Sequence, residues 1–239
     1  HWREIRTTLK MRFLLTRPSY DNEVLAKMLG KLGFDTSLDP VINIKHLPLP
    51  DLKIADYQGL IFTSTNGVIA FIEQAPLTDI PLFTVGDKTA EMAQKSGFTN
   101  VINAGGDVEK LSRTIINNAD PANGPLLYLR GAHIAADLNQ RLEEANFTVK
   151  SSIIYEAVPS EILQSQTINH LKKSTIDYIP FYSRRSSLIF IELIKKAGLE
   201  SCLSNVSALC LSPTIEKQIM HMPWKEILTT EKPTQKDLF

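Results

Sequence analysis

Short polar turns carrying hydroxyl, amide and arginine side chains follow several apolar segments of this sequence. Ser64, Thr65 and Asn66 follow the apolar residues 59–62, and Ser183 and Arg184 follow a similar segment that ends near Phe181. Helical periodicity begins after each turn, so the backbone N–H groups of a first helical turn lie close by. Those groups and the positive end of the helix dipole bind carboxylates or phosphates.

Several other positions share this chemistry. Thr89 and Thr214 begin two further helical stretches, and arginines occur beside the turns; the full set of donors is Arg17, Ser64, Thr65, Asn66, Thr89, Arg130, Ser183, Arg184, Arg185 and Thr214. Many separate donors predict a small ligand with many separate negative groups. A plainer interpretation remains open, because serine and threonine at helix starts are ordinary N-caps worth about 1 kcal/mol. The adjacent pair Arg184–Arg185 could equally be solvated.

Other site chemistries find little support. The sequence has no GxGxxG or GxxxxGK[ST] phosphate loop and no GxSxG elbow. The five histidines, at positions 1, 46, 133, 170 and 221, have no ligand spacing, so no metal site is expected. Cys202 and Cys210 are too few for a disulfide framework and are interpreted as buried thiols in a reducing compartment.

Composition limits the possible partners. The chain has 239 residues, 43% hydrophobic and 22% charged, with 26 basic and 26 acidic side chains and no net charge. This balance argues against nucleic acid or an anionic membrane as a partner. The apolar runs are far shorter than the roughly 20 residues of a membrane helix. No export signal is visible, so a cytoplasmic protein is expected, and the lack of an obvious apolar patch favours a monomer. Residues 1–10 are interpreted as an upstream extension or a remnant of cloning.

The elements that must position the turns are strand–helix units. Short apolar runs alternate with helical stripes, a pattern typical of parallel α/β sheets. The units start at residues 12, 59, 81, 126, 178 and 208. In such sheets the ligand lies beyond the carboxyl ends of the strands, where the polar turns are found.

These units form a repeat in circular order. Residues 61–73 resemble 180–192, residues 82–92 resemble 208–218, and residues 103–111 resemble 230–238, whereas 17–34 resemble 130–147. The first unit of the chain therefore matches the last unit of the middle block. The alternative to a true repeat is the generic similarity that any two strand–helix units share. Four pairs in one consistent order make this alternative the weaker explanation.

The order predicts two similar parallel-sheet domains, Rossmann- or flavodoxin-like, of which the first is discontinuous. Domain 1 comprises 11–36 plus 160–239, and domain 2 is inserted as 46–148. Two alternating segments, 37–45 and 149–159, are expected to run side by side as a two-stranded β linker. We expect the paired turns to share one cleft, with domain closure on ligand binding.

With these features in place, the sequence resembles the uroporphyrinogen-III synthase family. The residues that carry the resemblance are LLTRP, GLIFTSTNGV, VGDKTAEMAQKSGF, LYLRG, IIYEAVP, FYS and KPTQKDL, in this order from Met11 onward. The resemblance implies the same two-domain fold with a two-stranded linker. It also implies a hydro-lyase of haem biosynthesis that closes hydroxymethylbilane to uroporphyrinogen III, with loss of water and inversion of ring D.

The resemblance further implies a reaction without metal or organic cofactor, through azafulvene and spiro intermediates. The partner is the linear tetrapyrrole, which carries eight carboxylates, with a possible hand-over from hydroxymethylbilane synthase. The family's linker tyrosine matches Tyr155, which can donate a proton to the departing hydroxyl if it lies within reach. An aromatic that only packs at the hinge is the alternative for Tyr155.

The substrate contacts that the resemblance implies fall on residues of these turns and on one glycine: Ser64, Thr65, Asn66, Gly86, Thr89, Ser183 and Thr214. The second half departs from the family pattern, because Ser212 replaces a glycine and Ile215 stands where a second threonine is common. Thr214 would then act alone. Two other classes remain as alternatives: a non-enzymatic two-domain binder of a polyanion such as a tetrapyrrole, and a nucleotide-sugar or dinucleotide enzyme. The binder would lack the linker tyrosine or carry an export signal, and the nucleotide enzyme would need a phosphate loop.

Overall fold

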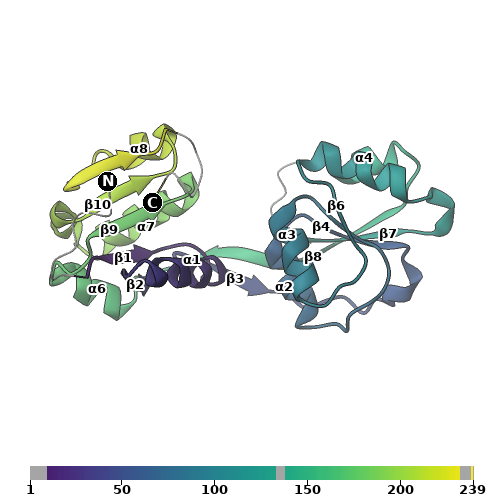
Figure 1. Ribbon diagram of the computed structural model, residues 1–239, viewed down its shortest axis with the longest axis horizontal. Helices are drawn as coiled ribbons and strands as arrows, with labels where there is room; N and C mark the ends of the chain where they lie inside the picture. The colour runs from purple at the N-terminus through teal and green to yellow at the C-terminus, as the bar shows by residue number, and fades with distance from the viewer. Residues whose placement is uncertain (1–9, 133–137, 232–237, 239) are drawn as a thin grey trace. The chain divides into compact units, whose positions relative to one another are not determined.

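The computed structural model describes residues 10–132, 138–231 and 238 (Figure 1). Most of the expected extension 1–10, residues 133–137 within the repeat segment 130–147, and all but Leu238 of the motif 232–238 lie outside the described residues. The described chain divides into two compact units. Unit 1 contains residues up to Asn43 and from Val158 onward, and unit 2 contains Ile44–Ala157.

Unit 2 is a three-layer α/β structure. Its strands lie in the order β3-β8-β7-β4-β5-β6, and β8 to β6 pair in parallel. The elements are β3 (Ile42–His46), η1 (Ile54–Asp56), β4 (Gly59–Phe62), α2 (Thr65–Ile72), β5 (Leu82–Thr84), α3 (Asp87–Lys95), β6 (Val101–Asn103), α4 (Val108–Asn118), η2 (Pro121–Asn123), β7 (Leu126–Gly131), α5 (Leu138–Glu143) and β8 (Val149–Pro159). Helices α2 and α3 cover one face of the sheet, and α4 and α5 cover the other.

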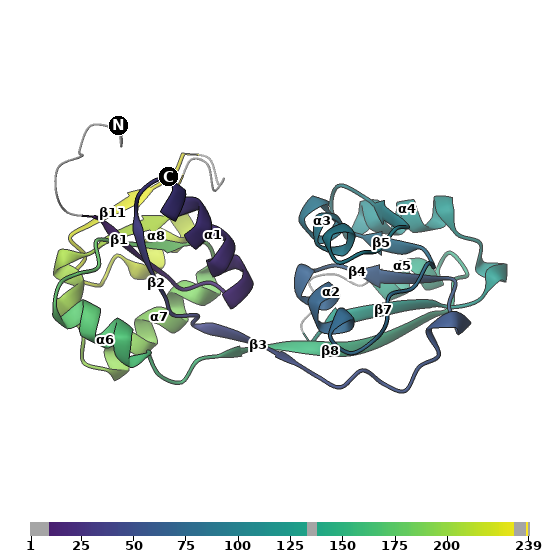
Figure 2. The same ribbon diagram turned by 60° about the horizontal axis from the view of Figure 1, so that its bottom comes forward.

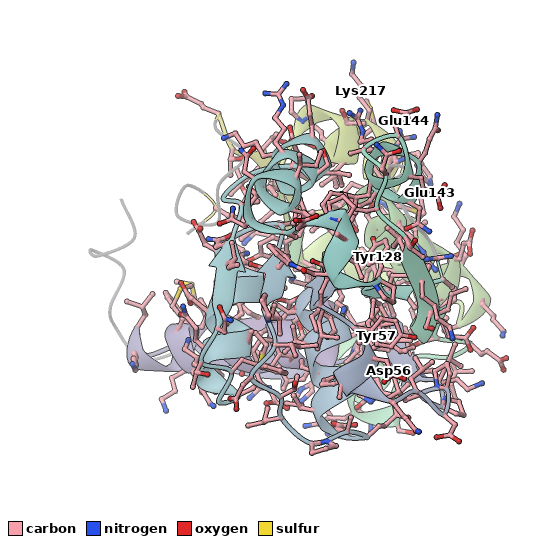
Figure 3. All side chains as sticks on the ribbon, turned by 90° about the vertical axis from the view of Figure 1, so that its right-hand side faces the viewer. Asp56, Tyr57, Tyr128, Glu143, Glu144 and Lys217 are labelled. Atoms are coloured by element: carbon pink, nitrogen blue, oxygen red, sulfur yellow. The ribbon has the colours of Figure 1, made fainter. Side chains whose placement is uncertain are left out.

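Alternation along the central strands of unit 2 produces these two faces. Phe62 of β4 packs with Phe71 of α2, whereas the neighbouring Ile61 packs with the cluster that includes Tyr128 of β7. Tyr57 and Tyr128, both labelled in Figure 3, belong to the two different clusters. Successive strand residues point to opposite faces, so an apolar run without alternation is what a sheet covered on both sides requires.

Unit 1 has five strands in the order β11-β10-β9-β1-β2, all paired in parallel. The elements are β1 (Arg12–Leu15), α1 (Ser19–Lys31), β2 (Asp35–Leu38), α6 (Ser165–Lys172), β9 (Tyr178–Phe181), α7 (Arg184–Lys196), η3 (Glu200–Asn205), β10 (Ser207–Cys210), α8 (Pro213–Ile219) and β11 (Glu226–Thr229). Helix α1 packs on one face through Leu25 and Leu29. Phe181 contacts Phe190 of α7 on the other.

The two sheets have the same order once the repeat is applied. β9, β10 and β11 take the places of β4, β5 and β6, and β1 and β2 take the places of β7 and β8. The amino-terminal strand pair therefore completes the sheet of the carboxyl-terminal half. This arrangement confirms the predicted fold class of two similar parallel-sheet α/β domains with a discontinuous first domain.

The chain passes between the units twice, within β3 and within β8. Leu47 N donates to Ile154 O and Ser160 N donates to Val41 O, so the two strands run antiparallel, and Figure 2 shows β3 beside β8. The segment 37–45, expected as one strand, is interrupted: β2 ends at Leu38 and β3 begins at Ile42, with Pro40 between them. Proline lacks the N–H that a continuous ladder requires.

In the described part of the chain, no helix is both long and apolar enough to cross a membrane.

Candidate functional site

In each unit the sheet gathers its polar turns at one edge. All strands from β8 to β6 are parallel, so the turns after β4, β5 and β7 lie at the carboxyl edge of the unit 2 sheet. Ser64 and Gly86 come from the first two of these turns, Arg130 lies at the end of β7, and β8 brings Tyr155 to the same edge. The strand order reverses between β4 and β7, and such reversals are where α/β proteins bind ligands.

Ser64 is the N-cap of α2. Its Oγ accepts a hydrogen bond from the backbone N–H of Asn66 at 3.1 Å. The structure therefore shows the capping role, and it leaves Thr65 and Asn66 partly exposed in the first helical turn. Neither has another side-chain hydrogen bond among the described residues, and the first turn retains backbone N–H groups that no helical carbonyl reaches.

Gly86 occupies the N-cap position of α3, where a Cβ would meet no atom within 4 Å. Thr89, in the first turn of that helix, is only 5% exposed, so its hydroxyl has little surface for a ligand. Asp87 begins the helix and accepts a hydrogen bond from the amide of Asn103 at 2.7 Å. An acidic residue here lowers the local positive potential, so this turn is a weaker anion site than the turn at Ser64.

A buried tyrosine joins the strands on either side of the reversal in unit 2. The hydroxyl of Tyr128 on β7 lies 3.0 Å from Thr63 Oγ, in the turn after β4. Tyr128 is 4% exposed, and burial raises the pKa of its phenol. Burial is the main cause of this shift, whereas the hydrogen bond with Thr63 and the positive charge of Arg130 act in the opposite direction.

The end of β7 carries Arg130 and faces Tyr155. Arg130 Nε donates to Ser151 Oγ at 2.8 Å and Nη1 donates to the carbonyl of Gly131 at 2.9 Å. Tyr155 is partly buried, and its carbonyl accepts from the backbone N–H of Ala132. It therefore lies within a hydrogen-bonded strand, with its ring beside Gly131.

Unit 1 presents its own set at the carboxyl edge of β1, β9 and β10. Arg17 follows β1, and its guanidinium lies 4.4 Å from the centroid of the Tyr182 ring and 3.0 Å from Asp21. Asn22, fully buried, accepts from Arg17 N and donates to Leu15 O, which closes this turn. Tyr182 has its pKa raised by burial, and its hydroxyl has no hydrogen-bond partner among the described residues.

The turn after β9 also ends in a capping serine, whose bond reaches one residue further into the helix than the bond of Ser64 does. Ser183 Oγ accepts from Ser186 N at 3.2 Å and lies 2.8 Å from Ser186 Oγ, so Ser183 caps α7. Arg184 is exposed, and its guanidinium lies beside the side-chain amide of Gln218, whose oxygen accepts from Nε at 2.9 Å when the amide is turned by 180°. Thr214 is exposed in the first turn of α8, after Ser212.

The described residues contain no group of three histidine, cysteine, aspartate or glutamate side chains that could hold a metal ion. Both cysteines are free thiols: Cys202 is partly buried, and burial raises the pKa of the Cys210 thiol to about 12. A thiol with that pKa is almost entirely protonated at neutral pH, so Cys210 is unsuited to nucleophilic chemistry.

Four residues of these turns escaped the sequence reasoning: Thr63, Tyr128, Gly131 and Tyr182. One signal was available, because Thr63 and Tyr182 hold the same repeat position, directly before the capping serines. Another was the tyrosine within the apolar segment LYLRG, since a buried phenol usually has a hydrogen-bond partner.

Comparison with known proteins identifies the family to which the chain is similar. The family model described as uroporphyrinogen-III synthase HemD matches residues 23–239. A curated protein of Methanocaldococcus jannaschii named "Putative uroporphyrinogen-III synthase" is 29% identical over 91 residues, which cover 36% of this chain and 38% of that protein. The chain thus matches well under half the length of that relative.

Among solved structures, uroporphyrinogen-III synthetase from Helicobacter pylori 26695 has a TM-score of 0.60 at 19% identity, over 96% of both chains. At that identity the likeness concerns the fold, which agrees with the two α/β units described above. The family model covers most of the sequence, including every candidate residue except Arg17. The chain belongs to the uroporphyrinogen-III synthase family.

Proposed function

We propose that the protein is a hydro-lyase that cyclises hydroxymethylbilane to uroporphyrinogen III, with loss of water and inversion of ring D. The observation that carries the proposal is the family match over residues 23–239. Tyr155 and the donor-rich turns, gathered at the carboxyl edge of each sheet, support it. The substrate's eight carboxylates match a protein whose anion-binding groups are mostly backbone amides and hydroxyls, and whose net charge is zero.

Tyr155 is proposed to help the hydroxyl leave. In this step the C–O bond of the hydroxymethyl group breaks, the phenol supplies the proton, and the oxygen departs as water. The resulting azafulvene cation bonds to the substituted carbon of ring D, which gives the spiro intermediate. The original bond between that carbon and its methylene bridge then breaks, the freed methylene bonds to the unsubstituted carbon of ring D, and that carbon loses a proton, which balances the proton supplied by the phenol. The partly buried phenol is held on a paired strand, which fixes its direction relative to the turns of unit 2.

Carboxylate binding is proposed for both sets of turns. In unit 2 the contacts are assigned to Ser64, Thr65, Asn66, Gly86, Thr89 and Arg130. In unit 1 they are assigned to Arg17, Ser183, Arg184 and Thr214. Thr65 and Asn66 have the strongest support within unit 2, because they are partly exposed in the first turn of a capped helix. Thr89 has the weakest, because its side chain is buried.

The protein is further proposed to act as a cytoplasmic monomer without metal or organic cofactor, and to receive its unstable substrate from hydroxymethylbilane synthase. Support for a cofactor-independent reaction comes from its chemistry, since loss of water and ring closure change no oxidation state. Size-exclusion chromatography with light scattering, with and without that synthase, tests both association proposals.

Product analysis tests the proposed activity. Purified protein is given hydroxymethylbilane, and the oxidised products are separated by chromatography. We expect the type III isomer well above the type I isomer that forms spontaneously, and we expect Tyr155→Phe to reduce type III formation without abolishing it. Type I alone, with tight tetrapyrrole binding, would instead identify a non-enzymatic binder.

A further inference from the structure

The end of β7 is irregular beside Tyr155. The parallel pairing of β7 with β8 proceeds residue by residue from Leu126 opposite Val149 to Arg130 opposite Ile153. It then shifts by one residue, so that Gly131 stands opposite Tyr155. The extra residue is Ile154 in β8, so the bulge bends β8 and changes the direction of the side chain that follows, Tyr155. Bulges are frequent next to active sites.

Gly131 leaves room for the phenol at this bulge. A Cβ at position 131 would lie 2.7 Å from Cζ, 2.8 Å from Cε2 and 2.9 Å from the hydroxyl oxygen of Tyr155. These distances are far shorter than the van der Waals contact of carbon atoms. Only a residue without a side chain therefore permits the observed position of the phenol hydroxyl.

The requirement for glycine comes from this contact. The φ angle of Gly131 lies outside the left-handed region, so alanine could adopt the same backbone. The backbone on either side is also held: Arg130 Nη1 bonds to the Gly131 carbonyl, and Ala132 N bonds to the Tyr155 carbonyl. With the backbone fixed, an added methyl group would displace the end of the tyrosine side chain.

We propose that Gly131, together with the bulge at Arg130–Gly131, is a positioning residue that sets the location of the Tyr155 hydroxyl. This inference rests on the proposed function for its catalytic meaning. Its structural part, the control of the phenol position by residue 131, stands independently. The bulge brings residue 131 opposite Tyr155, and the absence of a side chain there lets the hydroxyl lie against the strand end.

The first test follows the phenol in the substrate-free protein. The chain contains six tyrosines, and 3-fluorotyrosine labelling gives each a ¹⁹F resonance, of which Tyr155→Phe identifies one. In Gly131→Ala we expect the Tyr155 resonance to shift, with an unchanged circular dichroism spectrum. The matched control is Gly30→Ala, because a Cβ at Gly30 meets no atom within 4 Å. An unshifted Tyr155 resonance in Gly131→Ala would overturn the proposal.

The second test is a double-mutant cycle on the formation of uroporphyrinogen III. We expect Gly131→Ala to lower kcat roughly ten- to hundredfold with a smaller change in KM, since about 1 Å of misplacement can cost that much. Adding Gly131→Ala to Tyr155→Phe should lower kcat little further, because both changes remove the same positioned hydroxyl.

The outcomes separate the two proposals. A positioning role is contradicted if kcat in the double variant falls by the product of the two single losses. It is also contradicted if Gly131→Ala keeps full activity. If the wild-type protein forms no type III isomer, the proposed activity fails, and the ¹⁹F experiment still decides whether residue 131 controls the phenol position. Gly30→Ala should keep wild-type kcat and KM in every case.

Discussion

The turn after β4 in unit 2 and the turn after β9 in unit 1 begin alike and end differently. Both follow a buried phenylalanine that packs on a second one in the next helix, with ring centroids 5.8 Å apart for Phe62–Phe71 and 5.5 Å for Phe181–Phe190. Both continue into a serine that caps the helix. The residue before each serine differs, and it contacts the strand across the reversal of strand order.

In unit 2 that residue is Thr63, which hydrogen-bonds to the buried Tyr128 of β7. In unit 1 it is Tyr182, whose ring lies against the guanidinium of Arg17. The repeated strand, phenylalanine pair and capping serine therefore fix where the two turns lie, and the partners on the neighbouring strand give the turns different chemistry. We interpret unit 2 as the carrier of proton transfer and unit 1 as a charged binding surface.

The largest expected effect concerns the phenylalanine pairs that both units share. Phe71→Ala and Phe190→Ala each remove a fully buried ring and should lower the free energy of unfolding by about 3–5 kcal/mol. The two costs should be similar, because each ring also contacts a second aromatic side chain, Phe98 for Phe71 and Trp224 for Phe190. Urea unfolding followed by circular dichroism measures both. A cost under about 1 kcal/mol in either variant would show that the two pairs do not support their sheets equally.

The residue before the serine should separate the two units. Thr63→Val leaves the buried Tyr128 hydroxyl without its partner and should cost about 1–3 kcal/mol of unfolding free energy. Most of that loss should return in Thr63→Val/Tyr128→Phe, which removes both polar groups. Tyr182→Phe should leave stability unchanged or raise it, because the change removes a buried hydroxyl that has no hydrogen-bond partner among the described residues. Equal costs for Thr63→Val and Tyr182→Phe would erase the distinction.

The capping serines should behave as a matched pair. Ser64→Ala and Ser183→Ala should each cost about 1 kcal/mol, whereas glycine at either position should cost only a few tenths. Glycine loses the same hydroxyl, so it separates capping from substrate binding. If the serines also bind carboxylates, KM should rise in the glycine variants, measured on the rate of type III formation. An unchanged KM in both would restrict these serines to capping.

The smallest effect distinguishes the ends of β2 and β8. Asp39, just past β2, is 2% exposed, and its carboxylate accepts a hydrogen bond from the backbone N–H of Gln164 at 2.9 Å. Burial is the main cause that raises the pKa of this carboxyl. Ser152 holds the matching position in unit 2. A raised carboxyl pKa means that protonated Asp39 stabilises the fold. This contribution is complete at pH values below the pKa of the carboxyl in the unfolded chain, about 3.9. It is lost as the pH rises through the higher pKa of the same carboxyl in the folded chain.

Asp39→Asn should therefore gain stability relative to wild type as pH increases, and Ser152→Ala should show no such trend. Urea unfolding at several pH values between about 4 and 7 measures the difference. A difference between Asp39→Asn and wild type that stays constant with pH would mean that this carboxyl titrates alike in the folded and unfolded chains.

The fold could be predicted because its signals are local. Apolar runs, capping serines and helix-ending glycines recur within short windows, and their circular order revealed the discontinuous first domain. The interruption at Pro40 was missed because alternation on both sides suggested one strand. The predicted domain boundaries stay a prediction, since compactness does not measure independent folding.

The site was predicted less completely, because its key contacts join residues distant in sequence. The Thr63–Tyr128 bond and the stacking of Arg17 on Tyr182 depend on which strands are neighbours. The contact of Gly131 with Tyr155 depends on a one-residue shift of register, which no pattern in this sequence predicts. The roles assigned to individual substrate-binding residues remain predictions.

Single-turnover kinetics with saturating hydroxymethylbilane test the division of tasks between the units most directly. Type III formation is followed for wild type, Tyr155→Phe in unit 2 and Arg17→Gln in unit 1. We predict that Tyr155→Phe slows the step at saturation roughly ten- to hundredfold. Arg17→Gln should raise the substrate concentration needed for half-saturation and leave the saturated rate near wild type. A normal saturated rate in Tyr155→Phe together with a slow one in Arg17→Gln would contradict the assignment of proton transfer to unit 2.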